Sequence, residues 1–354
     1  MTRRNHFTPC LYLKHFAGQE GKLFVYRVLV PDTRVPYWKP STPAGVGYIE
    51  HLYTPTVAGH DTDEIEAWLK HDYEDPAAVP LRRAVADERL TCKDWDCLIR
   101  LLAAQIVRTP AYFVRRFPHW QAQTQEWLNA TLQDAVRHLR AGDRPSPLPA
   151  RDYAEYLPIH VERTIDPNAA DGTLKASMVV GRGLWLFAMR TVLAGAGAQA
   201  LHDHHWSILG PHDGLDWSTS DDPVILLNHQ GEGRYDFGGG TGSTGTEILF
   251  PLSPRRVMYA RIGERPPRRG WQFSLEDTRK IRCIIAEHAH RMVLAKCRDD
   301  EIPRLRPRVA NDKQFREEQS SWQRWHEEQN AAERQLTEAQ TTPLAPAGAR
   351  PVDA

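Results

Sequence analysis

The sequence predicts an α+β fold in which a helical core of about six helices packs against a small, mostly antiparallel sheet. Residues from about 60 to 205 carry apolar residues at helical spacing over several long stretches. Residues from about 206 to 262 contain short runs of β-branched and aromatic residues, separated by glycine, proline and aspartate. A similar run at residues 23–28 (Leu-Phe-Val-Tyr-Arg-Val) predicts that an N-terminal strand joins the sheet.

Six segments are the expected helices. Thr62 or Asp63 can cap the first one, and Pro110 should end or kink the second, because proline lacks the amide hydrogen that a helix needs. The first helix is expected to start near residue 63. The other five are expected at residues 93–116, 120–139, 173–201, 275–297 and 312–340. The later strands are expected at 206–209, 223–227, 247–250 and 256–261.

One globular domain is expected over residues 1–300, with its helical part at about 60–205 and its strand-rich part at about 206–262. A peripheral polar helix should occupy 301–340, and the polar composition of 341–354 predicts a disordered tail. The proline-rich segment 141–151 reads as a connector. Trp322 and Trp325 lie on an otherwise charged helix and are expected to dock on their own domain, with a partner protein as the alternative.

Composition excludes several classes of protein. The 45 basic and 45 acidic residues balance, which argues against coating nucleic acid or an anionic membrane by bulk charge. The five cysteines form no C-x-x-C pair, which favours a reducing compartment. No continuous apolar segment follows the basic start, and the apolar stretch 177–200 carries Arg182 and Arg190. We therefore expect a cytoplasmic protein without a membrane span.

Phosphate-binding loops are not expected either. The glycine-rich segment 238–246 is not followed by the lysine and helix that such loops require. The spacings G-x-x-x-x-G-K-[ST] and G-x-S-x-G do not occur. No nucleotide cofactor is expected.

The helix at 93–116 carries an unusual face. Leu98, Leu101, Gln105 and Arg108 follow one helical stripe, so two strong hydrogen-bonding groups continue an apolar face. If that face is buried, both groups need partners. Arg108 could then grip a carboxylate or phosphate in bidentate fashion. The alternative is an internal salt bridge, or exposure near the helix end.

Asp221 and the histidines form the other candidates. Asp221 lies in Ser218–Pro223, just before an apolar strand, where it could bind a metal or act as a base, or could merely start the strand in a turn. The cluster at 202–205, His-Asp-His-His, is expected to be a solvated loop, because four adjacent residues cannot all face one ion. His288 falls on an apolar helix face and is expected to be a core histidine.

The chain resembles an uncharacterised, mostly bacterial family known as domain of unknown function 4238. The resemblance covers about residues 5–295 and implies no reaction, but it singles out His6, Glu50, Gln105, Arg108 and Asp221 as motif positions. Asp222 departs from the pattern, which has asparagine there. The matching segments are Asn5–Pro9 continuing to Phe16, Gly47–Tyr53 with Glu66 and Glu74 following, Ala104–Pro110, Thr219–Val224 and Phe250–Pro254.

These residues predict a metal-dependent hydrolase of phosphoesters, with a nuclease as one form. His6 would act as general base or metal ligand, and Arg108 would stabilise negative charge while Gln105 orients the substrate. A divalent ion, Mg²⁺ or Mn²⁺, would be held by His6, Glu50, Glu74 and Asp221 and would activate water. Two alternatives remain open at this point: a binding or sensor module for a small anionic ligand or a protein partner, and a structural network that locks the N-terminal strand onto the helices.

Overall fold

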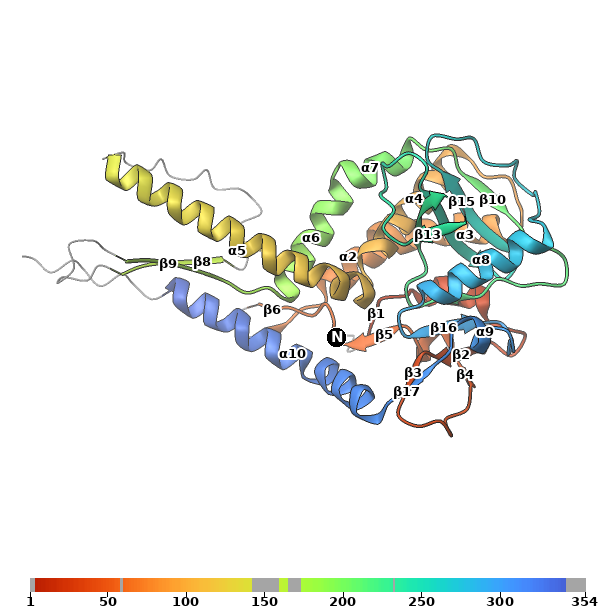
Figure 1. Ribbon diagram of the computed structural model, residues 1–354, viewed down its shortest axis with the longest axis horizontal. Coiled ribbons are helices and arrows are strands. Elements are labelled where there is room, and N and C mark those ends of the chain that lie inside the picture. Colours follow the sequence, from red (N-terminus) through yellow and green to blue (C-terminus); the bar gives the residue numbers. More distant parts are fainter. Residues whose placement is uncertain (1–3, 58–59, 142–158, 165–172, 232, 342–354) are drawn as a thin grey trace, which may run out of the picture. The chain divides into compact units, whose positions relative to one another are not determined.

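The computed structural model describes the chain except for residues 1–3, 58–59, 142–158, 165–172, 232 and 342–354 (Figure 1). The chain divides into two compact units: Met1–Arg116 with Trp185–His326, and Phe117–Leu184 with Glu327–Ala354. Apart from their first residues, the predicted connector at 141–151 and the predicted tail at 341–354 lie outside the described residues.

The first unit mixes helices with several small sheets, which confirms the α+β prediction. Its largest sheet is antiparallel, with strand order β10-β15-β14-β12-β13. The strands of this sheet are β10 (Ser207–Leu209), β12 (Ile225–Gly231), β13 (Arg234–Asp236), β14 (Glu247–Ser253) and β15 (Arg256–Arg261). The four strands expected between 206 and 261 are therefore all present.

A second, four-stranded antiparallel sheet has the order β11-β16-β2-β4. Its strands are β2 (Leu23–Arg27), β4 (Trp38–Ser41), β11 (Thr219–Ser220) and β16 (Met292–Ala295). Three two-strand pairings complete the unit: β1 (Arg4–His6) with β5 (Tyr48–Glu50), β3 (Leu29–Val30) with β17 (Val309–Ala310), and β6 (Thr56–Val57) with β7 (His60–Asp61). The predicted N-terminal strand at 23–28 is β2, which joins the four-stranded sheet between β16 and β4, while β1 pairs with β5.

Helices supply most of the remaining structure. Helix α4 begins with a capping box, in which Thr91 and Asp94 satisfy each other's backbone amides. The helix expected over 93–116, with an end or kink at Pro110, ends at Val107, and Pro110 starts α5, which also covers the helix expected at 120–139. The helices are α1 (Cys10–Leu13), α2 (Glu64–Leu69), α3 (Asp75–Val85), α4 (Cys92–Val107), α5 (Pro110–Ala141), α6 (Arg182–Ala194), α7 (Ala196–His202), α8 (Leu275–His288), α9 (Ile302–Leu305) and α10 (Asp312–Thr341). Three shorter turns are η1 (Lys14–Phe16), η2 (Pro43–Gly45) and the π-helical η3 (Lys70–Glu74).

The five-stranded sheet is covered on both faces. In strand β14, Phe250 belongs to a core cluster that includes Leu98 and Leu102 of α4. Its neighbour Leu249 belongs to another cluster, which includes Ile284 of α8. Because successive strand residues point to opposite faces, α4 and α8 pack on opposite sides of this sheet. This burial explains why β14 is a nearly continuous apolar run.

Two predicted helices are wrong in part. The expected helix 275–297 ends at His288, and its last residues form β16, because Val293 and Leu294 pair with β2. The expected helix 173–201 is strand β9 (Thr173–Met178) followed by α6 and α7, with a break at Gly195. Local periodicity does not distinguish an apolar helix from an apolar strand that finds its partner far along the chain.

The stretch Arg182–His202 has the length and apolarity of a membrane span. Of its most apolar 18-residue segment, 33% is buried inside the protein. Core helices of soluble proteins have the same length and apolarity. The cytoplasmic location and the absence of a membrane span therefore stay predictions.

The second unit contains the greater part of α5, a hairpin of β8 (Ile159–Thr164) with β9, and the last part of α10. Arg182 is fully buried in this unit. Its guanidinium binds Glu333 at 2.5 and 3.0 Å, and its backbone amide donates to the side chain of Gln329 at 2.7 Å. A buried ion pair therefore joins the start of α6 to α10 within the unit.

Candidate functional site

Strand β1 is fastened to the segment that follows β5. The buried carboxamide oxygen of Asn5 accepts hydrogen bonds from the Tyr53 amide at 3.0 Å and the Thr54 hydroxyl at 3.1 Å. The amides of Phe7 and Thr8 both donate to the carbonyl of Gly47 at 2.9 and 3.1 Å. Hydrogen bonds of the backbone and of the Asn5 side chain therefore hold residues 5–8 in place. None of these bonds involves a titratable side chain.

The polar end of the α4 face also binds this strand. The Gln105 amide donates to the carbonyl of Phe7 at 2.8 Å, and the guanidinium of Arg108 donates to the carbonyl of His6. Arg108 is fully buried and pairs with Glu74 of η3 at 2.7 Å. The face predicted from spacing is thus buried, and both of its polar residues have partners.

Glu66 of α2 joins the same group. One of its carboxylate oxygens accepts a bond from the amide of His6 at 3.4 Å. Burial raises the pKa of Glu66 to about 7, because the opposing charge of Arg108 only partly offsets the desolvation of the carboxylate. Burial also lowers the pKa of the His6 imidazole. Near neutral pH we expect a neutral imidazole beside a carboxyl group that exchanges its proton readily.

The charge of Arg108 is secured by its surroundings. Burial alone disfavours a charged guanidinium, but Glu74, Tyr53 and Glu66 outweigh that effect and raise the pKa of Arg108. The Tyr53 hydroxyl also donates to the carbonyl of Arg108, which satisfies one of the free carbonyls at the end of α4. Arg108 therefore stays charged inside the protein.

We call His6, Glu66, Glu74, Gln105 and Arg108 the β1 network. Four of its members have a buried polar atom without a hydrogen-bond partner among the described residues. These atoms are His6 Nε2, Glu66 Oε2, Gln105 Oε1 and Arg108 Nε. Buried polar atoms nearly always have partners, so four exceptions among residues that contact one another around β1 are typical of a site that serves a ligand or water.

Two predicted site residues lie elsewhere. Glu50 is exposed at the end of β5, where it faces Arg4 across the strand pair. Asp221 is buried, and its carboxylate accepts the backbone amides of His290 and Arg291 at 3.0 and 2.8 Å. The structure thus brings His6, Glu74, Gln105 and Arg108 together. Asp221 directly follows β11 and binds the two residues that precede β16.

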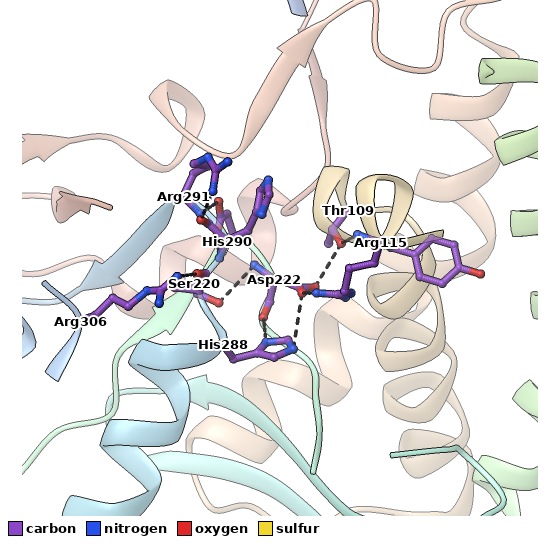
Figure 2. Close-up of polar contacts among 11 residues, drawn as sticks. Thr109, Arg115, Ser220, Asp222, His288, His290, Arg291 and Arg306 are labelled. Atoms are coloured by element: carbon purple, nitrogen blue, oxygen red, sulfur yellow. Dashed lines mark hydrogen bonds and ion pairs between the residues drawn. The ribbon is translucent and has the colours of Figure 1, made fainter. Parts of the chain in front are cut away.

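A second network surrounds the neighbouring Asp222, as Figure 2 shows. Its carboxylate accepts a bond from the Thr109 hydroxyl at 3.1 Å and pairs with Arg115 at 2.6 Å. The His288 imidazole lies against it, with Nδ1 2.9 Å from the Asp222 carbonyl and Nε2 3.5 Å from the carboxylate. We call these four residues the Asp222 network. His288 is the buried, hydrogen-bonded core histidine that the sequence predicts.

Burial dominates the charges around this second network. Burial raises the pKa of Asp221 to about 7. The hydrogen bond from the Arg291 amide lowers this pKa, whereas the negative charge of Asp222 raises it further. Burial lowers the pKa of His288, and it lowers that of His290 to about 4, helped by the positive charge of Arg291. Both imidazoles are therefore neutral at physiological pH.

The two networks meet at one point of the chain. Arg108 belongs to the β1 network, and its neighbour Thr109 belongs to the Asp222 network. Sequence reasoning did not place Arg115 or Glu66 among the candidate site residues. Glu66 does follow one of the motif segments, which was the available signal, whereas the contact between Arg115 and Asp222 joins residues 107 positions apart.

The four predicted metal ligands, His6, Glu50, Glu74 and Asp221, do not gather around one point. Within the described part of the chain, the His, Cys, Asp and Glu side chains close enough to share an ion belong to His51, Asp61 and His326. The β1 network therefore does not fit a metal held by the predicted set.

The fold and the two networks define a mixed α+β protein with buried, titratable side chains around the end of one helix. The chain belongs to the family described as Protein of unknown function (DUF4238), whose model matches residues 4–299. The match includes both networks and ends before α10. No curated protein and no solved structure matches the chain.

Proposed function

We propose that this protein is a hydrolase whose proton-transfer groups are Glu66 and His6 of the β1 network. The observation that carries the proposal is the buried Glu66 carboxyl, which bonds to β1 through one oxygen while the other has no partner in the described residues. Its pKa, raised to about 7, suits a general base that must both accept and release a proton near neutral pH.

In this proposal each residue has a separate task. Glu66 takes the proton of the attacking water, and the neutral His6 imidazole, whose Nε2 is unpartnered, passes that proton to the leaving oxygen as the ester bond breaks. Gln105 and Arg108 are positioning residues, because they bond to the carbonyls of Phe7 and His6. Arg108 is buried and already paired with Glu74, so its charge fixes β1.

The proposed substrates are phosphoesters, with nucleic acid and small anionic esters as the classes to test. Two carboxylates and one arginine leave the β1 network without excess positive charge, so an anionic substrate would need a divalent cation such as Mg²⁺ or Mn²⁺. No step of the proton transfer is assigned to that ion, because the residues predicted to hold it are not assembled at β1.

The test is a hydrolysis assay on the full chain with model phosphodiesters, phosphomonoesters, single-stranded DNA and RNA, each with Mg²⁺, with Mn²⁺ and with a chelator. We expect turnover that rises as the pH passes about 7, where Glu66 loses its proton. Glu66→Gln should lower turnover about 100-fold or more, as expected for the loss of a general base. The matched control is Glu20→Gln, since the Glu20 side chain is 81% exposed.

Three results would count against the proposal. They are no cleavage of any substrate, a Glu66→Gln protein as active as wild type, and a rate without dependence on pH around 7. A ligand that binds without turnover would instead favour the binding or sensor module.

A further inference from the structure

A cluster of two histidines and one aspartate lies outside both networks. His51 follows β5, Asp61 ends β7, and His326 lies on α10. The ligand atoms of the three side chains lie within 4.8 Å of one another. The three residues come from segments as far apart as 275 positions, so the cluster is produced by the fold rather than by local sequence.

The aspartate presents one oxygen to both histidines. Asp61 Oδ1 accepts a hydrogen bond from the Thr56 hydroxyl at 2.8 Å, across the β6–β7 pair. Asp61 Oδ2 lies 3.2 Å from His326 Nε2 and 3.9 Å from His51 Nδ1. The Thr56 bond therefore fixes the carboxylate in the way that outer partners orient metal ligands.

These spacings suit a shared metal ion. Ligand atoms about 2.0–2.1 Å from a tetrahedral Zn²⁺ lie roughly 3.3 Å from one another. The observed separations of 3.2 and 3.9 Å lie on either side of that value. A direct hydrogen bond explains only the shorter one, because His51 Nδ1 is buried and has no hydrogen-bond partner among the described residues.

The backbone at His51 adopts an unusual conformation and is held by a contact with α10. His51 has a φ of 54°, a left-handed conformation that costs energy in a residue other than glycine. The next residue, Leu52, accepts a hydrogen bond from the indole of Trp325 at 3.1 Å, and Trp325 precedes His326. This bond confirms that Trp325 docks on its own domain, and it places the two imidazoles face to face at 4.3 Å.

The cluster lies near the protein surface. The side chains of His51, Asp61 and His326 are 20%, 26% and 19% exposed, so none of them belongs to the fully buried core.

We propose that His51, Asp61 and His326 form a Zn²⁺ site with one coordination position left for water. Two imidazoles and one carboxylate are a ligand set of Zn²⁺ centres with an open position. Mg²⁺ and Ca²⁺ prefer oxygen ligands throughout, so they fit this set less well. The bound ion would connect α10 to β7 and to the residue after β5. The site does not rest on the proposed hydrolase activity.

The test is Zn²⁺ binding to the full, tag-free chain, measured by calorimetry and by metal content after dialysis. We expect one equivalent per chain and a rise in melting temperature on loading. Asp61→Asn keeps the shape of the ligand and the acceptor for Thr56, and it should weaken binding by more than the ~10–100-fold typical of losing an outer partner. Thr56→Val should weaken binding within that smaller range.

The matched control is His205→Ala, which removes an exposed histidine from the 202–205 loop. It should leave Zn²⁺ binding unchanged. Circular dichroism of each variant checks folding, and Co²⁺ loaded into wild type should give the absorption of a tetrahedral site. The proposal is overturned if wild type binds no Zn²⁺, if Asp61→Asn binds it as tightly as wild type, or if His205→Ala removes the binding.

Discussion

The β1 network and the Asp222 network both bury one charge of an ion pair, but they bury opposite partners. In the β1 network the cation is inside: the Arg108 side chain is 0% exposed and that of Glu74 is 15% exposed. In the Asp222 network the anion is inside: the Asp222 side chain is 2% exposed, while that of Arg115 is 52% exposed. The two networks adjoin in the chain at Arg108 and Thr109. Their ion pairs therefore differ in which of the two charges is exposed to solvent.

This difference separates a fixed pair from an exchangeable one. Arg108 cannot leave Glu74 without carrying a charge through the protein interior, which costs several kcal/mol. Arg115 can move into water at little cost, because its charge is already half solvated. We expect the β1 network to be rigid and the Asp222 network to respond to its solution conditions.

The largest expected effect is on stability in the β1 network. Arg108→Met keeps most of the volume but leaves Glu74 without its cation and the His6 carbonyl without its donor. We expect the free energy of unfolding to fall by about 3–5 kcal/mol. Urea denaturation measures it, with the exposed Arg265→Met as control. A loss below about 1 kcal/mol would show that the pair contributes no more than a surface pair.

The next effect is a pH dependence caused by Glu66. The unfolded carboxyl ionises above about pH 4.5, whereas the folded one keeps its proton until about pH 7. The folded state therefore loses stability as the pH rises through this window, by up to about 3 kcal/mol. Glu66→Gln cannot ionise and should be more stable than wild type at pH 8, with no difference from this group below pH 4.5. Parallel stability curves for the two proteins would contradict the raised pKa.

A smaller effect is expected in the Asp222 network. Arg115→Leu should cost about 1–2 kcal/mol, because it leaves a buried carboxylate with only Thr109 and His288. In an Asp222→Asn background, which restores the asparagine of the family pattern, the same change should cost close to nothing. A double-mutant cycle by urea denaturation measures this coupling. Equal costs in the two backgrounds would mean that Arg115 and Asp222 do not interact.

The smallest effect distinguishes the two pairs by salt. Raising the salt concentration from 0.1 to about 1 M shortens the screening length from ~10 Å to ~3 Å. The Arg115–Asp222 coupling should weaken by a fraction of a kcal/mol, since Arg115 is half exposed. The coupling of Arg108 to Glu74 should change less. If both couplings fall equally, the difference in burial has no energetic consequence.

Sequence reasoning located the helix face of the β1 network because the signal is local. The spacing of Leu98, Leu101, Gln105 and Arg108 lies within a few turns of one helix. The partners of that face could not be predicted. Arg108 binds residues 34 and 102 positions away, and one of those bonds goes to a backbone carbonyl that carries no sequence signature.

The misplaced elements have the same origin. The segment after His288 continues an apolar pattern, but the Asp221 carboxylate captures the amides of His290 and Arg291, and the chain then pairs as β16. The cluster of His51, Asp61 and His326 likewise depends on how α10 docks. Patterns within a segment predicted the elements, whereas contacts between distant segments decided their ends and their partners.

The anchoring of β1 through its main chain has a consequence for variation at position 6. Gln105 and Arg108 bond to the carbonyls of Phe7 and His6, and every amino acid offers the same carbonyl. The anchor therefore sets no requirement on the imidazole. A substitution at position 6 therefore separates the folding of β1 from the function of the imidazole. A His6→Asn chain should fold with β1 in place, so any activity that it loses depends on the imidazole.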